Sequence, residues 1–186
     1  MLFLNPKINH YLFGADWGFS NDPNTLLRCF IGQHKEYGSN CLFIEYEAND
    51  RPYNEDMRNT STSIDDLPNL WDKVPLSREY RITADSARPE TIAHMNSKGF
   101  NVIGAIKGSG SVEDGIEFIR GFDKVIIHPR CTNTIFEFGN YKFKVDVKSG
   151  QITSNIVDKY NHMIDALRYA LESSMKNQII DYSTLL

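Results

Sequence analysis

The sequence predicts an α/β fold with a mixed central sheet, which begins as an antiparallel meander, continues through parallel β/α crossovers and is flanked by helices. Three β-rich runs follow one another closely near the start of the chain, whereas strand-like and helix-like segments alternate tightly further on. Short connections favour antiparallel pairing, and helical crossovers join parallel strands. The length of 186 residues suits one domain.

The first strands are expected where β-forming residues gather between turn residues. These runs are Tyr11–Asp16, Thr25–Ile31 and Cys41–Tyr46. A helix is expected over Ser63–Trp71, because its apolar residues recur at helical spacing. Tyr80–Ala84 should form a fourth strand.

The middle of the chain carries helix start and stop signals. Pro89 suits the first turn of a helix and Gly99 its end, which predicts a helix over Pro89–Lys98. A strand over Phe100–Ile106 should follow.

A second helix is expected after this strand. Ser111 with Asp114 three residues later resembles a capping box with Asp in place of Glu, and Gly121 should end the helix. Lys124–His128 should form the next strand.

The C-terminal part predicts a hairpin and a long helix. Tyr141–Ser154 reads as a β-hairpin that turns at Lys148-Ser149-Gly150. A helix should start near Asp158 and run toward Lys176, because its apolar residues form one stripe.

Composition excludes several classes of protein. A hydrophobic share of 41% with 24% charged residues excludes a disordered or fibrous chain. No apolar run approaches the roughly 20 residues of a membrane helix, and no signal peptide is evident, so we expect a soluble, non-secreted protein. Cys29, Cys41 and Cys131 contain no CxxC pair and should be buried free thiols. The net charge of -4 argues against nucleic-acid binding by bulk positive potential but allows a local basic face.

Three aspartates lie at positions where the predicted fold could bring their carboxylates together. Asp16 ends the first predicted strand, Asp85 follows the fourth, and Asp165 lies in the terminal helix. Strand ends converge on one edge of such a sheet, and a helix packed across that edge can add the third carboxylate. Hard oxygen ligands select Mg²⁺ or Mn²⁺, and two such ions can activate a water and stabilise the leaving oxygen of a phosphodiester. For any one aspartate alone, a capping or turn role is commoner.

The terminal helix adds a histidine to this set. Asp158, His162 and Asp165 are spaced by four and three residues and would share one helix face. His162 could bind a metal, relay a proton or orient the carboxylate. The alternative is a surface histidine bonded to Asp158.

Four motifs then occur in a fixed order along the chain. They are Gly14-Ala15-Asp16-Trp17-Gly18-Phe19 with Asp22-Pro23, then Thr83-Ala84-Asp85-Ser86-Ala87, then Ile106-Lys107-Gly108-Ser109-Gly110-Ser111-Val112 with Gly115-Ile116, then Asn161-His162-Met163-Ile164-Asp165-Ala166-Leu167-Arg168-Tyr169. Each motif is weak alone, but their order and spacing resemble the nuclease domain of the large terminase subunit of tailed double-stranded DNA bacteriophages. The resemblance covers about Tyr11 to Leu171. It implies a ribonuclease H-like fold, which agrees with the order of elements above.

The resemblance implies roles for individual residues. Asp16, Asp85 and Asp165 would bind two Mg²⁺ or Mn²⁺ ions in a two-metal-ion endodeoxyribonuclease. Asp22 and His162 match positions that approach a metal or the active site in some members, and they rank below the triad.

The resemblance also implies contacts with DNA. Lys107 would touch the scissile phosphate, although a DNA-backbone contact or a solvated loop lysine fits equally well. Lys142, Lys144 and Lys148 lie in the predicted hairpin, which matches an element beside the active site, and would contact phosphates. The alternative is a hairpin made soluble by its lysines.

Family members carry an N-terminal ATPase domain with a phosphate-binding loop, but the sequence contains no GxxxxGK[ST] motif. We therefore expect residues 1–186 to be a single nuclease domain with a core of about 11–176, to lack the ATPase domain and not to hydrolyse ATP.

The implied function is cleavage of concatemeric viral double-stranded DNA during genome packaging. The implied partners are DNA, the terminase small subunit, the portal protein of the procapsid and the separate ATPase domain. The implied location is the host cytoplasm and, transiently, the portal. Two alternatives remain: a Holliday-junction resolvase or transposase-like nuclease of the same fold, and a non-catalytic DNA- or portal-docking module.

Overall fold

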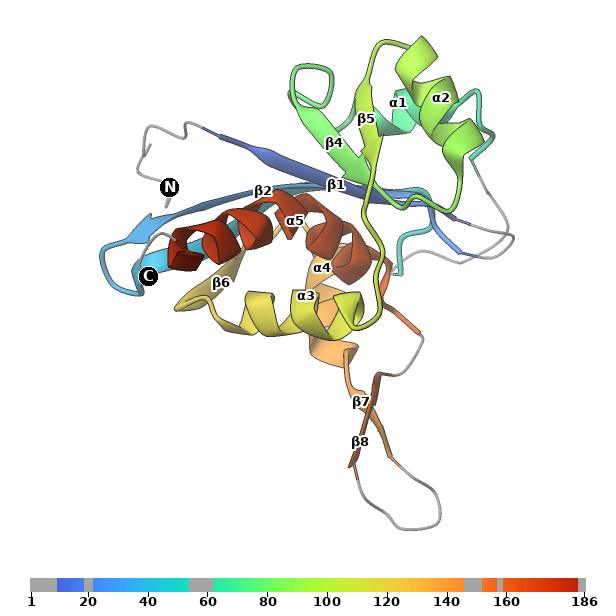
Figure 1. The fold of residues 1–186 in the computed structure, drawn as a ribbon. Helices are drawn as coiled ribbons and strands as arrows, with labels where there is room; N and C mark the ends of the chain where they lie inside the picture. The colour runs from blue at the N-terminus through green and yellow to red at the C-terminus, as the bar shows by residue number, and fades with distance from the viewer. Residues whose placement is uncertain (1–9, 19–21, 54–61, 146–151, 157–158, 184–186) are drawn as a thin grey trace.

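The computed structural model describes residues 10–18, 22–53, 62–145, 152–156 and 159–183. The elements in chain order are β1 (Leu12–Asp16), β2 (Thr25–His34), β3 (Gly38–Asn49), α1 (Leu67–Trp71), β4 (Arg81–Ala84), α2 (Pro89–Ser97), β5 (Asn101–Gly104), α3 (Ser111–Arg120), β6 (Lys124–Ile127), α4 (Thr132–Asn140), β7 (Phe143–Val145), β8 (Ile152–Ile156) and α5 (His162–Ser183). Six strands form the central sheet in the order β5-β4-β1-β2-β3-β6, and β7 pairs with β8. Figure 1 shows α1 and α2 on one side of this sheet and α3, α4 and α5 on the other.

The sheet has the two halves that the sequence predicts. β1, β2 and β3 form an antiparallel meander, while β4 lies parallel to β1 and β5 parallel to β4. Both the meander and the parallel crossovers are therefore confirmed. The carboxyl ends of β1 and β4 consequently lie side by side at one edge of the sheet.

The position of β6 could not be read from the alternation of helices and strands. It pairs parallel with β3, at the edge opposite β5. Ile119 and Phe122, at the end of α3, pack with Leu42 and Ile44 of β3 in one apolar cluster. The chain thus crosses the face of the sheet along α3, whose apolar end packs near β3, and β6 then pairs with β3.

Each face of the sheet has its own apolar core. Trp71 of α1 is fully buried against Trp17, whose ring stacks on it with centroids 5.4 Å apart. On the other face, Leu167 and Leu171 of α5 are buried with Leu27 of β2. Cys29, Cys41 and Cys131 are free and buried, as predicted. None of the described helices combines the length and apolarity needed to cross a membrane.

α5 lies directly on the backbone of β1. A Cβ atom on Gly14 would lie 1.9 Å from the carbonyl oxygen of Ala166 and 2.5 Å from the backbone nitrogen of Ala170. Only glycine leaves room for this approach, because real Cβ contacts are longer than 3.0 Å. The close packing holds the first turns of α5 near the end of β1.

α2 begins at Pro89 as predicted, and α1 begins at Leu67 rather than Ser63, but the start signals predicted for α3 and α5 are both misplaced. Gly110, with φ of 81°, is the N-cap of α3, and no side chain caps this helix, so the predicted capping box at Ser111 is wrong. α5 begins at His162 rather than near Asp158, because Tyr160 has a φ of 57° in the left-handed region. Asp158 itself lies outside the described residues.

α4 was not predicted at all. Its nine residues include two threonines, two asparagines and a glycine, which are weak helix formers. Tertiary contacts rather than intrinsic propensity must therefore stabilise this helix.

Gly14→Ala should lower the free energy of unfolding by about 2–3 kcal/mol, because the added methyl group meets backbone atoms that cannot rotate away. Urea denaturation measures the change. Gly139→Ala is the matched control, since nothing lies within 4 Å of its Cβ position in α4, and it should be neutral or stabilising. Wild-type stability in Gly14→Ala would contradict the close packing of α5 on β1.

Candidate functional site

Asp16 and Asp85 lie at the carboxyl ends of neighbouring parallel strands. Ala15 stands beside Ala84 in the β1–β4 register, so the next residue of each strand is an aspartate. The backbone nitrogen of Asp85 donates to the carbonyl of Ala15 at 3.1 Å. Trp17 donates its indole N–H to the carbonyl of Asp85 at 2.7 Å. These bonds hold the two aspartates at one point of the sheet edge.

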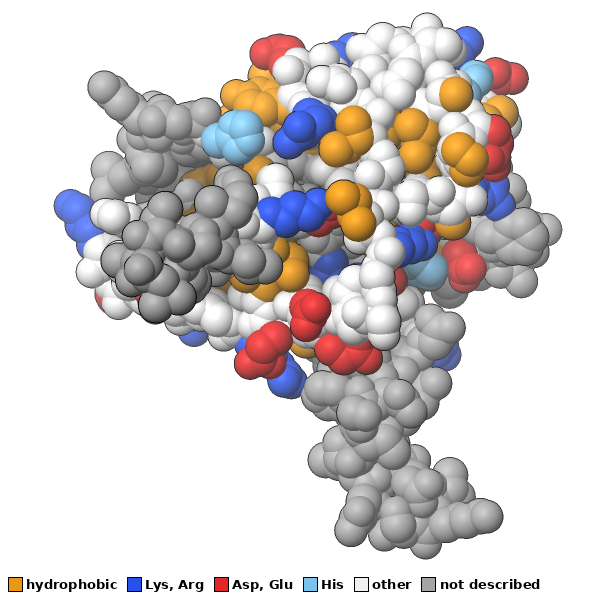
Figure 2. Space-filling view, viewed as in Figure 1, with side chains coloured by type: hydrophobic (Ala, Val, Ile, Leu, Met, Phe, Trp, Pro, Cys, Tyr) orange, Lys and Arg blue, Asp and Glu red, His pale blue; other side chains and the backbone are white. Residues whose placement is uncertain are grey.

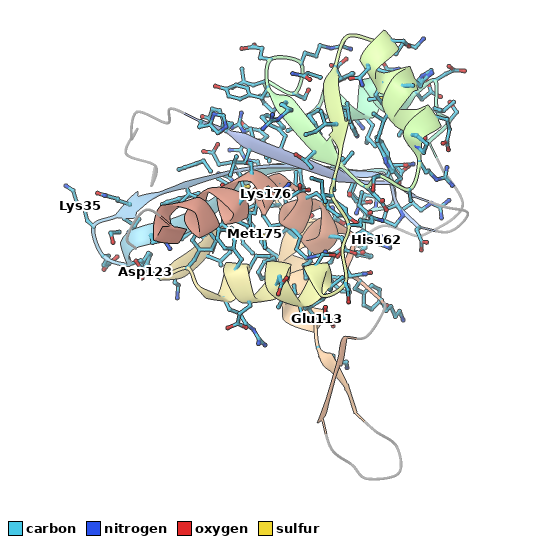
Figure 3. All side chains as sticks on the ribbon, viewed as in Figure 1. Lys35, Glu113, Asp123, His162, Met175 and Lys176 are labelled. Atoms are coloured by element: carbon cyan, nitrogen blue, oxygen red, sulfur yellow. The ribbon has the colours of Figure 1, made fainter. Side chains whose placement is uncertain are left out.

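Asp165 reaches this edge from α5. Its backbone nitrogen donates to the carbonyl of Asn161 at 2.7 Å, in the first turn of the helix. Figure 3 places His162 at the start of α5, at the end of the sheet opposite Lys35 in the β2–β3 turn. In Figure 2, basic, histidine and acidic side chains meet beside the start of this helix. The structure thus brings the predicted triad together from β1, β4 and α5.

Asp16 interacts electrostatically with both Asp85 and Asp165. Burial raises the pKa of Asp16, and the negative charge of Asp85 raises it further, although His162 opposes both effects. Burial also raises the pKa of Asp165 to about 6, with Arg168 opposing and Asp16 adding to the increase. Neighbouring negative charges of this kind make a site that attracts cations.

Each aspartate of the triad is paired with a basic side chain. The pairs are His162 Nδ1 with Asp16 Oδ2 at 3.0 Å, Lys107 Nζ with Asp85 Oδ1 at 2.5 Å, and Arg168 Nη1 with Asp165 Oδ1 at 2.5 Å. Among the described residues, no three His, Cys, Asp or Glu side chains are arranged to hold a metal ion as they stand. The protein's own cations therefore compensate the carboxylates in this arrangement.

His162 connects the triad with Asp22. Its Nε2 lies 3.6 Å from Asp22 Oδ1, and the Asp22 side chain is 55% exposed. Burial lowers the pKa of His162, but the hydrogen bond and charge of Asp16 outweigh burial, so the net shift is upward. Asn24, which follows Asp22 closely, is bound by Asp50 through its backbone and side-chain nitrogens at 2.9 and 2.8 Å. The imidazole therefore bridges two carboxylates that come from β1 and from the segment before β2.

Lys107 lies on the connection between β5 and α3. Its side chain is 45% exposed, and its Nζ lies 6.0 Å from the ring centre of Tyr169. The ammonium group therefore has both a carboxylate partner and access to solvent.

Arg168 is a site residue that sequence reasoning missed, although its spacing of three residues from Asp165 was a signal. Its Nη2 donates to the carbonyl of Ser111 at 3.2 Å, which ties α5 to the start of α3. A Cβ atom on Gly115 would lie 2.8 Å from Arg168 Nε, so this glycine makes room for the guanidinium stem.

The hairpin lysines are only partly described. β7 and β8 extend away from the sheet beyond α4 (Figure 1). Lys142 is exposed directly before β7, the backbone of Lys144 belongs to β7, and Lys148 lies outside the described residues.

Comparisons with known proteins agree with this geometry. The family model of the terminase RNase H-like domain matches residues 16–173. The large terminase subunit of Bacillus phage SPP1 is 32% identical over 166 residues, which cover 88% of this chain and 36% of that protein. The PBSX phage terminase large subunit of Bacillus subtilis (strain 168) is 27% identical over 159 residues, covering 86% and 33%. The chain spans about a third of the length of these curated relatives.

Solved structures of large terminases also resemble this chain. The g2p (large terminase) nuclease domain of bacteriophage SPP1, with bound Mn, matches with a TM-score of 0.73 and 29% identity, covering 90% of this chain and 88% of that one. A large terminase from a thermophilic bacteriophage, in complex with ADP, matches with a TM-score of 0.62 and 17% identity, covering 94% and 41%. The second likeness shows the fold alone.

Without divalent ions, stability should fall as pH rises from 4 to 7. Asp165 holds its proton to a higher pH in the folded protein than in the unfolded chain, and a pKa of about 6 against 3.8 corresponds to about 3 kcal/mol. The raised pKa of His162 acts in the same direction, since its stabilisation is lost as pH rises through the folded pKa. Urea denaturation in EDTA measures this loss. Asp165→Asn, which cannot titrate there, should give a flatter curve, and parallel curves would contradict the shift.

Proposed function

Because the chain belongs to the terminase RNase H-like family, we propose that it is a metal-dependent endonuclease that cuts concatemeric viral double-stranded DNA during genome packaging. Membership of the family confirms the resemblance found in the sequence, and the likeness to the SPP1 nuclease domain confirms the ribonuclease H-like fold. The observation that carries the proposal is the convergence of three electrostatically coupled aspartates on one sheet edge.

The donor atoms of this site suit hard divalent cations. Carboxylate oxygens are the ligands that Mg²⁺ and Mn²⁺ prefer. Burial and the neighbouring carboxylates raise the pKa values of Asp16 and Asp165, and a divalent ion would stabilise their ionised forms. The Mn bound to the SPP1 nuclease domain supports the same ligand class.

We assign the metal-binding role to Asp16, Asp85 and Asp165, with two ions of Mg²⁺ or Mn²⁺. When bound by these three carboxylates, such ions would supply activation of a water for attack on phosphorus and stabilisation of the leaving oxygen. His162 orients Asp16 through its Nδ1 and can hold a proton, because its pKa is raised. Asp22, on the far side of the imidazole, is the additional acidic group.

Lys107 would contact the DNA substrate rather than bind a metal ion. It pairs with Asp85 when no ion is present, and a metal ion at Asp85 would replace that partner. The half-exposed ammonium group could then turn to the scissile phosphate. Lys107 thus links occupation of the site to binding of the DNA backbone.

The remaining assignments follow from the relatives, which are large terminase subunits. Residues 1–186 would act as the nuclease part of the packaging machinery, together with an ATPase domain, the terminase small subunit and the portal protein of the procapsid. The place of action would be the host cytoplasm and, transiently, the portal. ATP hydrolysis is assigned to the partner domain, since the sequence lacks a phosphate-binding loop motif.

Asp16→Asn or Asp165→Asn should reduce Mn²⁺-dependent cleavage of linear duplex DNA to background while the protein stays folded, because each removes a ligand charge. Plasmid or linear-duplex cleavage followed on gels measures the loss. Asp65→Asn is the control. The Asp65 side chain is 80% exposed, and its Oδ1 lies 3.8 Å from His94 Nε2. Full cleavage by either triad variant would remove the basis of the assignment.

Charge reversal of the hairpin lysines should weaken cleavage of long duplex without changing Mn²⁺ binding. The variant replaces Lys142, Lys144 and Lys148 by Glu. Each phosphate contact contributes about 0.9 to the slope of log affinity against log salt, so the slope should flatten by up to about 3. The control reverses three exposed lysines elsewhere: Lys35, Lys73 and Lys98. A salt slope equal to that of wild type would show that the hairpin lysines serve only solubility.

A further inference from the structure

A fully buried carboxylate of α4 reaches the first turn of α5. Glu137 has 0% exposure. Its Oε2 accepts hydrogen bonds from the backbone nitrogens of Met163 at 2.8 Å and Ile164 at 3.0 Å. Its Oε1 accepts a hydrogen bond from the hydroxyl of Tyr53 at 2.7 Å. Both carboxylate oxygens are therefore engaged, and two of the three bonds go to α5.

These bonds satisfy the same backbone N–H groups that a helix N-cap satisfies. α5 begins at His162, so Met163 and Ile164 occupy the second and third positions, whose N–H groups the side chain before a helix usually accepts. Asn161, the residue before the helix, donates its Nδ2 to Asp165 Oδ2 at 3.0 Å. Glu137 accepts the N–H groups of Met163 and Ile164 from a neighbouring helix, and its negative charge suits the positive end of the α5 dipole.

The turn that Glu137 holds also carries two residues of the site. His162 precedes Met163, and Asp165 follows Ile164. We propose that Glu137 is a positioning residue that fixes the first turn of α5 and thereby sets where His162 and Asp165 meet the metal. This inference rests on the proposed nuclease function.

A second carboxylate anchors α4 to the central sheet in the same way. Glu47 of β3 accepts hydrogen bonds through Oε1 from both nitrogens of Asn133 at 2.8 Å. Its Oε2 accepts from the nitrogen and hydroxyl of Thr134 at 2.9 and 2.6 Å. Glu47 thus caps α4, and Glu137 of α4 caps α5. Since a buried carboxylate is costly unless its bonds are made, the buried Glu137 constrains α5 more tightly than the half-buried Glu47 constrains α4.

The experiment compares Glu137→Ala with Glu137→Gln in the 186-residue chain. Isothermal titration with Mn²⁺ measures affinity, and hydrogen exchange followed by NMR measures protection of the Met163 and Ile164 amides. Glu137→Ala should weaken Mn²⁺ affinity about tenfold and speed exchange of both amides, as loss of a group that orients a metal ligand does. Glu137→Gln should restore both, because its single carbonyl oxygen can accept both N–H groups as Oε2 does.

Glu47→Ala is the matched control. It removes the half-buried cap of α4, the helix that carries Glu137, and should lower the melting temperature while weakening Mn²⁺ affinity much less than Glu137→Ala does. Wild-type affinity in Glu137→Ala, or an equal loss in Glu47→Ala, would overturn the positioning role. If Glu137→Ala does not fold, Glu137→Asp decides the question, because it keeps the charge but shortens the reach, and unchanged affinity there overturns the proposal.

The two proposals fail differently. A wild-type chain that binds Mn²⁺ but does not cut DNA would contradict the proposed nuclease function. The affinities of the Glu137 variants would still decide the positioning role.

Discussion

Repulsion between like charges is the constraint on which the site depends. β1, β4 and α5 bring three carboxylates to one sheet edge, and burial of Asp16 and Asp165 removes much of the water that would screen them. Lys107, Arg168 and, when it is protonated, His162 place positive charges beside these carboxylates. These cations differ in mobility, because Lys107 is half exposed whereas Arg168 is buried between α3 and α5. In the proposed exchange of protein cations for divalent ions, we therefore expect Asp85 to be the first to change partner.

Packing holds α5 against that repulsion from three directions. Gly14 lets the helix backbone rest on β1, Arg168 ties it to α3, and Glu137 caps its first turn from α4. None of these contacts comes from the triad itself. The geometry of the carboxylates is thus imposed by the scaffold, as preorganised sites require. Substitution at a distance from the aspartates can consequently alter the site without removing a ligand.

The sequence predicted those parts of the fold that have local signals. Asp16 and Asp85 could be found because each directly follows a β-rich run, and the meander could be found because its connections are short. α4 contains few strong helix formers, so neither it nor Glu137 could be found, and the Glu137 contact with Met163 spans 26 residues. Lys107 was expected beside a phosphate, whereas its partner Asp85 comes from another strand end. The pairing of β6 with β3 depends on where α3 packs, which no local pattern records.

Diffraction from crystals grown with Mn²⁺, using the anomalous signal of manganese, would show directly whether this sheet edge binds metal ions. Anomalous peaks are expected between Asp16, Asp85 and Asp165, with the Lys107 ammonium displaced from Asp85. Crystals that show no peak at this sheet edge at saturating Mn²⁺, with all three aspartates still paired to His162, Lys107 and Arg168, would contradict this expectation.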